Sequence, residues 1–337
     1  MKVIIDVFGG DYGAAAAVSG GALAARQRQG LELVFAGDSA LIEPELKKHS
    51  VLTGRAEVLH APEGITNDEA PTVAIRNKKQ SSLVRALDLL KEDGADALVS
   101  AGSTGALLTG GLFKIGRIRG VSRPALCPIL PTISGGSTAL VDAGANVDCK
   151  PVHLSHFAVM GTAYMRTVMH IDSPRVALLS NGTEEKKGNE LNKEAYELLK
   201  GMAGINFVGN LEARDLLSGQ ADVIVADGFA GNIALKSYEG CARTVFSLLK
   251  KEISSGFLTK IGALLLKSGF KRVAGALDYN KVGGALILGL EKAVIKVHGS
   301  SKDTAFCAAV LQAADMHEGG VTQSIKQRLL TDAPAEV

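Results

Sequence analysis

Short apolar runs alternate with helical patterns along most of the chain, and this alternation constrains the fold more than any other feature. The runs that we interpret as strands are Val3–Val7, Leu31–Ala36, Glu57–His60, Ala95–Ser100, Thr138–Val141, Arg175–Leu179, Ile205–Val208, Asp222–Ala226 and Ala293–Val297. Several runs are apolar almost without interruption, as expected for parallel strands covered by helices on both faces. Helical patterns at Glu190–Lys200 and Gly231–Glu252 are long enough for crossovers between such strands. The sequence therefore predicts an α/β fold with three layers, α/β/α, around a mostly parallel sheet.

We expect a single domain over residues 1–330, because neither a repeat nor a strong linker divides the chain. A helical segment at about 250–280 is expected to protrude from this domain, and residues 331–337 are expected to form a flexible tail. The first apolar run is too short for a signal peptide, and no apolar run is long enough to span a membrane. A cytoplasmic location is therefore predicted.

Composition excludes several classes of partner and cofactor. A net charge of +2 and an aromatic content of 4% give no basis for nucleic-acid binding. The cysteines form no C-x-x-C pair and have small or apolar neighbours, so we expect buried, unreactive thiols and no metal site; they are Cys127, Cys149, Cys241 and Cys307. The chain also lacks G-x-G and Gly-Lys sequences, which excludes the dinucleotide fingerprint and the P-loop. No cofactor is expected.

Glycine makes up 39 of the 337 residues and collects where the predicted strands end. The glycine-bearing loops are 6–11, 100–105, 142–146, 181–185, 227–232 and 298–301. Ligands of α/β proteins bind at the carboxyl ends of strands, and glycine lets backbone N–H groups approach an anion. A simple turn explains each loop alone, but the set together predicts a pocket for phosphate or another polyanion.

Several ionisable side chains in or beside these loops are candidates for chemistry. His298 follows the last strand and could act as a general acid or base, although a buried structural histidine fits the pattern equally well. Lys186 could neutralise phosphate or could simply be solvated. Asp6, Asp142 and Asp227 each end a strand beside a glycine loop, where helix capping or turn formation also explains an aspartate.

The segment 250–272 differs from the rest of the chain because it carries six basic residues against one acid, Glu252. Apolar residues at helical spacing give it one apolar face; they are Phe257, Leu258, Ile261, Leu264 and Leu265. A helix that packs on the core has the same stripe. Lysine excess beside large aliphatic residues also fits a helix that lies on a membrane surface or binds a partner.

Long motifs in the chain resemble the bacterial PlsX-type phosphate acyltransferases. The matching stretches are Gly9–Asp11, SAGSTGAL at 100–107, RPAL at 123–126, DAGANVDCKP at 142–151, NGTEEKKGNEL at 181–191, INFVGN at 205–210, ADVIVADGFAGNIALKS at 221–237 and VIKVHGSS at 294–301. They keep the order of the family and cover essentially the whole chain. One departure is Ser103, where the family usually has asparagine.

The resemblance implies a fold like that of isocitrate and isopropylmalate dehydrogenases and of phosphotransacetylase, assembled as a homodimer. It also implies transfer of a fatty acyl group from acyl carrier protein to inorganic phosphate, which gives acyl phosphate for phosphatidic acid and phospholipid synthesis. A membrane glycerol-3-phosphate acyltransferase would use the product. Peripheral association with the inner face of the cell membrane is implied as well, and it suits the segment 250–272.

Under this resemblance phosphate attacks the acyl carbonyl directly, and the enzyme supplies mainly orientation and charge stabilisation. We predict that the catalytic group consists of Lys186, His298, Asn232 and Asp227. The predicted phosphate- or substrate-binding residues are Gly9, Gly10, Asp11, Ser103, Thr104, Gly105, Asn146, Asn181, Gly182, Thr183 and Asn189. The carrier protein is acidic, so basic clusters at 76–79 or 117–123 are candidates for its docking surface, with solvated surface charge as the alternative.

Two other functions stay open from the sequence. A phosphotransacetylase-like enzyme would use acyl-coenzyme A in place of the carrier-bound acyl group. A non-catalytic scaffold of lipid synthesis would bind the membrane through the segment 250–272 and release no thiol.

Overall fold

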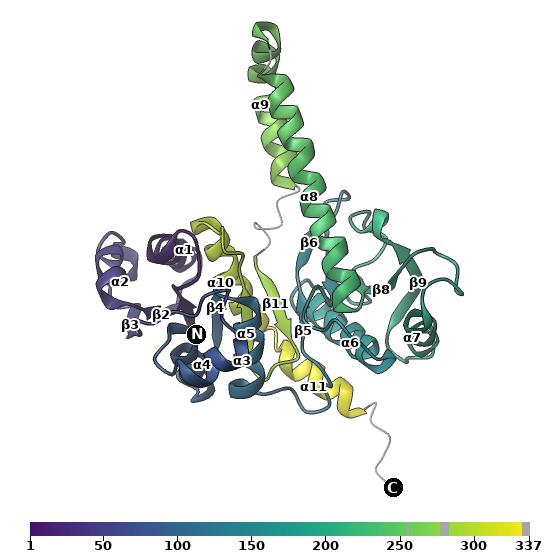
Figure 1. Cartoon of the computed structure of the whole chain (residues 1–337), viewed down its shortest axis with the longest axis horizontal. Helices are drawn as coiled ribbons and strands as arrows, with labels where there is room; N and C mark the ends of the chain where they lie inside the picture. The colour runs from purple at the N-terminus through teal and green to yellow at the C-terminus, as the bar shows by residue number, and fades with distance from the viewer. Residues whose placement is uncertain (255, 277–282, 332–337) are drawn as a thin grey trace.

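The computed structural model describes residues 1–254, 256–276 and 283–331, and its strands form two sheets (Figure 1). The first sheet has the order β3-β2-β1-β4-β12-β11-β5, with bounds Ala56–His60, Glu32–Gly37, Lys2–Asp6, Ala97–Ser100, Ala293–Lys296, Ala285–Leu288 and Ala125–Cys127. The second has the order β6-β7-β10-β8-β9, with bounds Ile129–Pro131, Ser137–Val141, Val223–Val225, Arg175–Ser180 and Asn206–Glu212. Each sheet with its helices is called a lobe, the first and the second.

The predicted α/β class is confirmed, with the strands divided over two sheets instead of one. Every run that we interpreted as a strand overlaps an observed strand. Among the described strands, only the pairs made by β11 and β6 are antiparallel. The sequence did not indicate β5, β6 and β11: β5 and β6 have three residues each, and β11 follows a pair of glycines.

Helices cover both faces of the first sheet, which explains why its strands are apolar without alternation. Along β1, Val3 and Ile5 face a core shared with α1 (Gly13–Gln27) and α10 (Asp303–Glu318). Ile4 faces the opposite core. That core is filled from α3 (Pro71–Asn77), α4 (Ser82–Lys91) and α5 (Thr104–Gly110). Both faces of the inner strands β1 and β4 are therefore buried, as the sequence pattern predicts, whereas the edge strand β3 has no fully buried residue.

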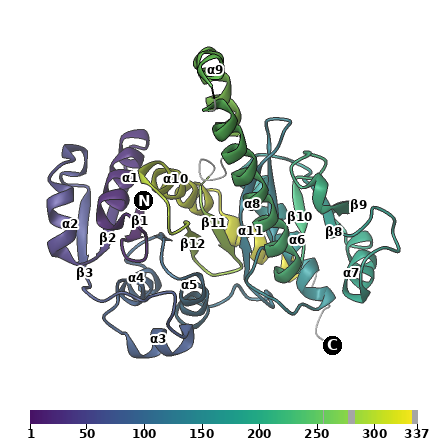
Figure 2. The same cartoon turned by 45° about the horizontal axis from the view of Figure 1, so that its top comes forward.

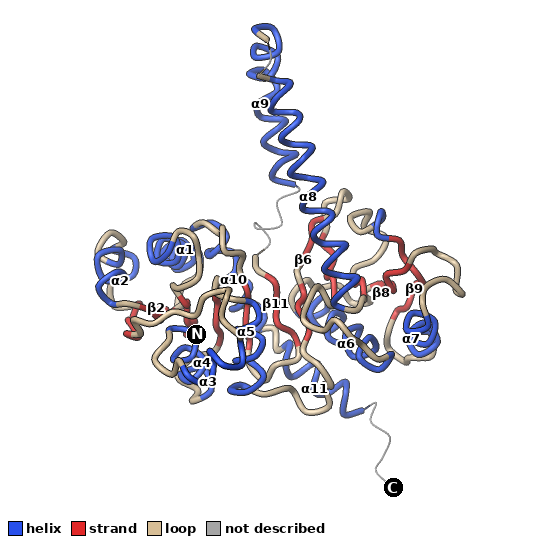
Figure 3. Tube along the Cα trace, viewed as in Figure 1, coloured by secondary structure: helices blue, strands red, loops and turns tan. Residues whose placement is uncertain are grey.

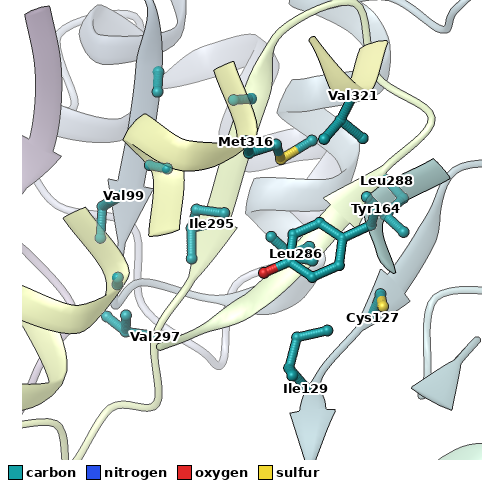
Figure 4. Packing of buried hydrophobic residues seen from close by; sticks show 14 of the residues in the cluster. Val99, Cys127, Ile129, Tyr164, Leu286, Leu288, Ile295, Val297, Met316 and Val321 are labelled. Carbon is teal, nitrogen blue, oxygen red and sulfur yellow. The ribbon is translucent and has the colours of Figure 1, made fainter. Parts of the chain in front are cut away.

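The second sheet is covered in the same way, by α6 (Pro151–Thr167) and α7 (Glu190–Lys200) on one face and by the start of α8 on the other. One core runs through both lobes, because β1 and β10 contribute to the same cluster of buried residues. Figure 4 shows part of it, where Tyr164 of α6, Leu286 of β11, Met316 of α10 and Val321 lie together. The remaining helices include α2 (Ser39–Leu46) and α11 (Val321–Thr331).

Helices α8 (Gly228–Ile253) and α9 (Phe257–Ala276) form a hairpin that stands out from the body of the molecule (Figures 2 and 3). The predicted helical segment at about 250–280 falls on this hairpin, except that residues 255 and 277–280 lie outside the described residues. So do residues 332–337 of the predicted tail at 331–337, whose first residue, Thr331, ends α11. Leu264 of α9 is 70% exposed. The side chains of Phe257, Leu258, Ile261 and Leu265 lie outside what the structure describes. Within the described part of the chain, no helix has both the length and the apolar character needed to cross a bilayer.

All four cysteines are unpaired. Cys127 and Cys307 are buried and Cys149 is half-buried, but Cys241 is exposed, so the prediction of a buried thiol is wrong for Cys241. The physical reason is that α8 has left the body of the second lobe by this point, and the side chains on most of its circumference lie outside the core.

Candidate functional site

A pocket of about 120 Å³ lies between the two lobes and collects polar side chains from both. Thr104, Lys296 and His298 come from the first lobe. Lys236 and Glu239 come from α8 of the second lobe, and they form an ion pair at 2.8 Å. We call this pocket the interlobe pocket. The rest of the wall comes from β5, β6 and the residue between them, from Leu235 of α8, and from residues 283–285 at the start of β11.

A buried carboxylate, that of Asp6, fixes the loops beside this pocket. Its oxygens accept hydrogen bonds from Ser82 Oγ at 2.6 Å, Ser100 Oγ at 2.7 Å and the Phe8 N–H at 3.1 Å. Burial raises the pKa of Asp6, whereas these three hydrogen bonds and the nearby Lys296 act in the opposite direction. Asp6 therefore ties β1, β4 and α4 together at the carboxyl end of the sheet.

Lys296, the last residue of β12, directs its ammonium group toward this end of the sheet. Nζ donates hydrogen bonds to the carbonyl oxygens of Ala101, at 3.1 Å, and Val297. Burial lowers the pKa of Lys296 to about 8, although Asp6 raises it and Lys236 lowers it further. A partly buried ammonium group in a small pocket is a strong electrostatic partner for an anion, because little water screens it.

The ring orientation of His298 is set by its own loop. Nδ1 accepts a hydrogen bond from the Ser300 N–H at 3.2 Å and lies 2.8 Å from Ser300 Oγ. Because Nδ1 accepts from a backbone N–H, the neutral ring carries its proton on Nε2. Partial burial, Lys236 and Lys296 lower the pKa of His298. The ring can therefore donate a hydrogen bond from Nε2 at neutral pH.

The second lobe has its own buried carboxylate, that of Asp142 at the end of β7. It accepts hydrogen bonds from the N–H groups of Leu126, Gly144 and Asn146, at 2.9, 3.1 and 2.7 Å, and also from Ala145. Burial raises the pKa of Asp142, and these hydrogen bonds oppose the rise. The start of α8 packs directly on this loop, since a Cβ atom at Gly231 would lie 1.9 Å from the Asp142 carbonyl oxygen.

A larger pocket of about 880 Å³ lies in the second lobe, between α8 and the loops that follow β8 and β9. Asn181, Asn189 and Asp227 are among its polar residues. Asp227 is the N-cap of α8 and accepts a hydrogen bond from the Ala230 N–H at 2.8 Å. We call this pocket the α8 pocket.

The predicted site residues of the first lobe come together. The loop after β1 packs on the loop after β4, since a Cβ atom at Gly9 would lie 2.4 Å from Gly102 Cα. The same loop contacts the loop after β12, because the Asp11 N–H donates to the Gly299 carbonyl at 2.8 Å. The three contacting loops and the start of α5 contain the predicted residues Gly9, Gly10, Asp11, Ser103, Thr104, Gly105 and His298.

The other predicted residues form a separate group. Asn181, Asn189 and Asp227 line the α8 pocket. Asn232 lies beside Gly144, and the Asn146 amide donates hydrogen bonds to Asp142 and to the Pro124 carbonyl. Gly182, Thr183 and Lys186 lie on the loop between β8 and α7, where Lys186 is exposed and lines neither of the two pockets.

Sequence reasoning missed Lys296, Lys236 and Glu239, which line the interlobe pocket. The signal for Lys296 was present, because a lysine interrupts the apolar run Ala293–Val297 just before the glycine loop. A charged residue at the end of a buried strand has to have a partner or a function. Lys236 and Glu239 sit on α8 and carry no comparable signal. Among the described residues, no group of three histidine, cysteine or acidic side chains could hold a metal ion.

The chain is similar to known proteins in both sequence and fold. A family model described as fatty acid synthesis protein matches residues 1–324. A phosphate acyltransferase from Clostridium novyi is 47% identical over 329 residues, which is 98% of each chain. A phosphate acyltransferase from Bacillus cereus is 46% identical over 316 residues, which is 94% of each chain. The structure of the EutD phosphotransacetylase from Staphylococcus aureus has a TM-score of 0.61 at 19% identity and covers 94% of each chain, a likeness of fold alone.

Proposed function

Since the chain belongs to the fatty acid synthesis protein family and is an acyltransferase, we propose that it moves a fatty acyl group from acyl carrier protein to inorganic phosphate. The products are acyl phosphate and the free thiol of the carrier protein. The observation that carries the proposal is the interlobe pocket, where Lys296, His298 and Thr104 meet in a protein whose relatives are phosphate acyltransferases.

In the proposed reaction a phosphate oxygen attacks the thioester carbonyl, the carbonyl oxygen becomes negatively charged, and the carbon–sulfur bond then breaks. Phosphate is already nucleophilic and a thiolate leaves readily, so the protein supplies positioning and charge stabilisation. The Lys296 ammonium group holds the phosphate dianion. The Nε2–H of His298 donates a hydrogen bond to the carbonyl oxygen as it gains charge, and Thr104 Oγ1 orients the phosphate.

The loops of the first lobe supply the remaining phosphate contacts in this proposal, from Gly9, Gly10, Asp11, Ser103 and Gly105. Their backbones are fixed by Asp6 and by the contacts among the three loops, so they lose little freedom when an anion binds. The residues of the second lobe act on the acyl group: Asn232 and Asp227 near the thioester, and Asn146, Asn181, Gly182, Thr183, Lys186 and Asn189 around its approach.

The proposal extends to partners. Exposed large apolar side chains on the hairpin support contact with the inner face of the cell membrane; they are Leu248, Leu264 and Leu266. A homodimer is also part of the proposal, as the resemblance to the phosphate acyltransferases implies. Acyl phosphate is reactive and its hydrocarbon chain is apolar, so it would pass to a membrane enzyme that acylates glycerol 3-phosphate.

One assay separates this function from its rivals. The protein is incubated with palmitoyl-acyl carrier protein or with palmitoyl-coenzyme A, each with and without phosphate, and free thiol is measured. We expect phosphate-dependent thiol release from the carrier-bound donor. Release from coenzyme A alone would instead identify a phosphotransacetylase-like enzyme, and no release from either donor would identify a scaffold.

A further inference from the structure

We propose that the α8 pocket holds the hydrocarbon chain of the acyl donor, an inference that rests on the proposed function and names the binding site of its apolar substrate. The pocket volume of about 880 Å³ falls in the range of about 300–1,000 Å³ that suits small organic ligands. The interlobe pocket, with about 120 Å³, is far too small for the same chain.

The lining of the α8 pocket changes from polar to apolar along its length. At the ends of β8 and β10 its walls are Asn181, Asn189 and Asp227. Further along α8 the walls are mostly apolar, with Ile233 and Ala234 on the helix and Leu216 opposite, although Ser237 and Arg214 also line the pocket. An acyl thioester has the same polarity, since its carbonyl end is polar and its chain is not.

Two exposed apolar side chains are explained by such a ligand. Phe229 is 60% exposed and Ile233 is 51% exposed, although both lie in the first turns of a helix that starts in the body of the second lobe. Both line the α8 pocket. Large apolar side chains gathered in a hollow favour an apolar ligand, which removes them from water.

The pocket continues along the helix. Tyr238 and Cys241 line its far end and also line a second hollow of about 230 Å³, whose other walls include Val245, Phe246 and Leu249. Ala234, Tyr238, Cys241 and Val245 recur at helical spacing, so they form one stripe of α8. From Ala230 to Cys241 the helix rises about 16 Å. A long acyl chain therefore has room to extend from the strand ends toward the hairpin.

Cys241 gives a direct probe of occupancy in the unmodified protein. It is the exposed cysteine of the four, and it lies at the far end of the α8 pocket. Its rate of alkylation by N-ethylmaleimide is measured with and without cis-parinaric acid, a fluorescent fatty acid. We expect saturating fatty acid to slow the labelling at least about tenfold, and Cys241→Ser to abolish the labelled fraction. Labelling that fatty acid leaves unchanged would overturn the proposal. So would protection that depends on protein concentration alone, which would mean that a second copy of the chain covers the pocket.

A chain-length experiment tests the same pocket in the reaction. Ala234 is 8% exposed and lines the pocket, so Ala234→Phe fills part of it. We expect the ratio of kcat/KM for palmitoyl to that for octanoyl carrier protein to fall at least about tenfold, since each buried methylene is worth about fourfold in affinity. The matched control is Gly240→Phe, because a side chain at Gly240 meets open space; it should leave the ratio within twofold of the unmodified protein, as a rough bound.

The two proposals fail in different ways. If the unmodified protein forms acyl phosphate but Ala234→Phe keeps its chain-length ratio, the acyl pocket is wrong and the proposed function stands. If the protein forms no acyl phosphate from either donor, the proposed function is wrong, and Cys241 protection still decides whether the pocket binds a fatty chain.

Discussion

Replacement of Lys296 by methionine tests the chemistry of the interlobe pocket most sharply. The substitution keeps the length of the side chain and removes its charge. A fall of the Lys296 pKa from 10.5 to about 8 means that the surroundings of Lys296, burial foremost, disfavour the ammonium form by roughly 3 kcal/mol in total. A phosphate dianion that enters the pocket recovers much of this energy, because it returns a partner to a poorly solvated charge.

We expect Lys296→Met to lower kcat/KM by about a hundredfold, the effect typical of losing one group that stabilises developing charge. The pH profile is the more specific readout. With a pKa of about 8, Lys296 is about nine-tenths protonated at pH 7 and about one-tenth at pH 9. The unmodified protein should therefore lose activity as the pH rises through 8, and Lys296→Met should show no such loss.

Unfolding cannot produce the same profile. The pKa of Lys296 is lower in the folded protein than in the unfolded chain, so the folded state binds fewer protons between about pH 8 and 10.5. The contribution of Lys296 to stability therefore increases as the pH rises through this range. The control is Lys236→Met, since Lys236 faces the same pocket but is exposed. The alkaline loss of activity should persist in this variant and move to higher pH, because Lys236 lowers the pKa of Lys296. The role of Lys296 in holding phosphate would be refuted if Lys296→Met kept full activity, or if its activity still fell as the pH rose through 8.

Three further predictions concern other parts of the molecule. His298→Gln should lower kcat/KM by about ten- to a hundredfold, because it alters an Nε2–H donor in the pocket. Thermal stability should change little, because the ring makes only local hydrogen bonds. A rate equal to that of the unmodified protein would remove His298 from the mechanism. Asp142→Asn should destabilise the protein by about 2 kcal/mol or more, measured by urea unfolding, because an amide nitrogen would face backbone N–H donors. The control Asp148→Asn, at an exposed position, should change the free energy of unfolding by less than about 0.5 kcal/mol. Equal losses in the two variants would contradict the assigned role of Asp142. The double variant Leu264→Glu, Leu266→Glu should no longer sediment with vesicles rich in phosphatidylglycerol. The control Leu198→Glu, at an exposed position on α7, should still sediment with them. Unchanged vesicle binding by the double variant would exclude α9 as the membrane contact.

The strand pattern could be predicted from sequence because burial on both faces makes these strands apolar throughout. Val3, Ile4 and Ile5 are all fully buried, although they face two different cores. The division into two sheets could not be predicted in this way. The division depends on β5, β6 and β11. These strands are short or follow a pair of glycines, and their sequences show no hydrophobic periodicity that would predict a strand.

The glycine loops show how a sequence signal can have two causes. The excess of glycine in these loops predicted an anion pocket, and the loops of the first lobe do lie together beside the interlobe pocket. Some of the glycines, however, are required by packing. Gly9 lies against Gly102, and Gly231 lies against the Asp142 carbonyl, at distances that no side chain permits. Backbone contact between segments distant in sequence has the same signature as anion binding, so the sequence could not separate the two.

Only part of the candidate site could be predicted, because some of its residues come together only in the folded protein. Thr104 and His298 could be selected because they follow strands, and the structure places both in the interlobe pocket. Lys236 and Glu239 lie on a helix of the other lobe, and only the tertiary arrangement brings them to His298. Lys186 was predicted from its charge and its position in a glycine-bearing loop, but it lines neither pocket.

The central claim is that phosphate itself attacks the thioester, and the most direct measurement follows the phosphate oxygens. Palmitoyl-acyl carrier protein is incubated with the protein and phosphate labelled with oxygen-18, and the products are identified by mass spectrometry. Direct attack predicts palmitoyl phosphate that retains all of the labelled oxygens, with one free thiol released for each molecule formed. Release of thiol with unlabelled palmitic acid as the product, and no acyl phosphate, would contradict the account.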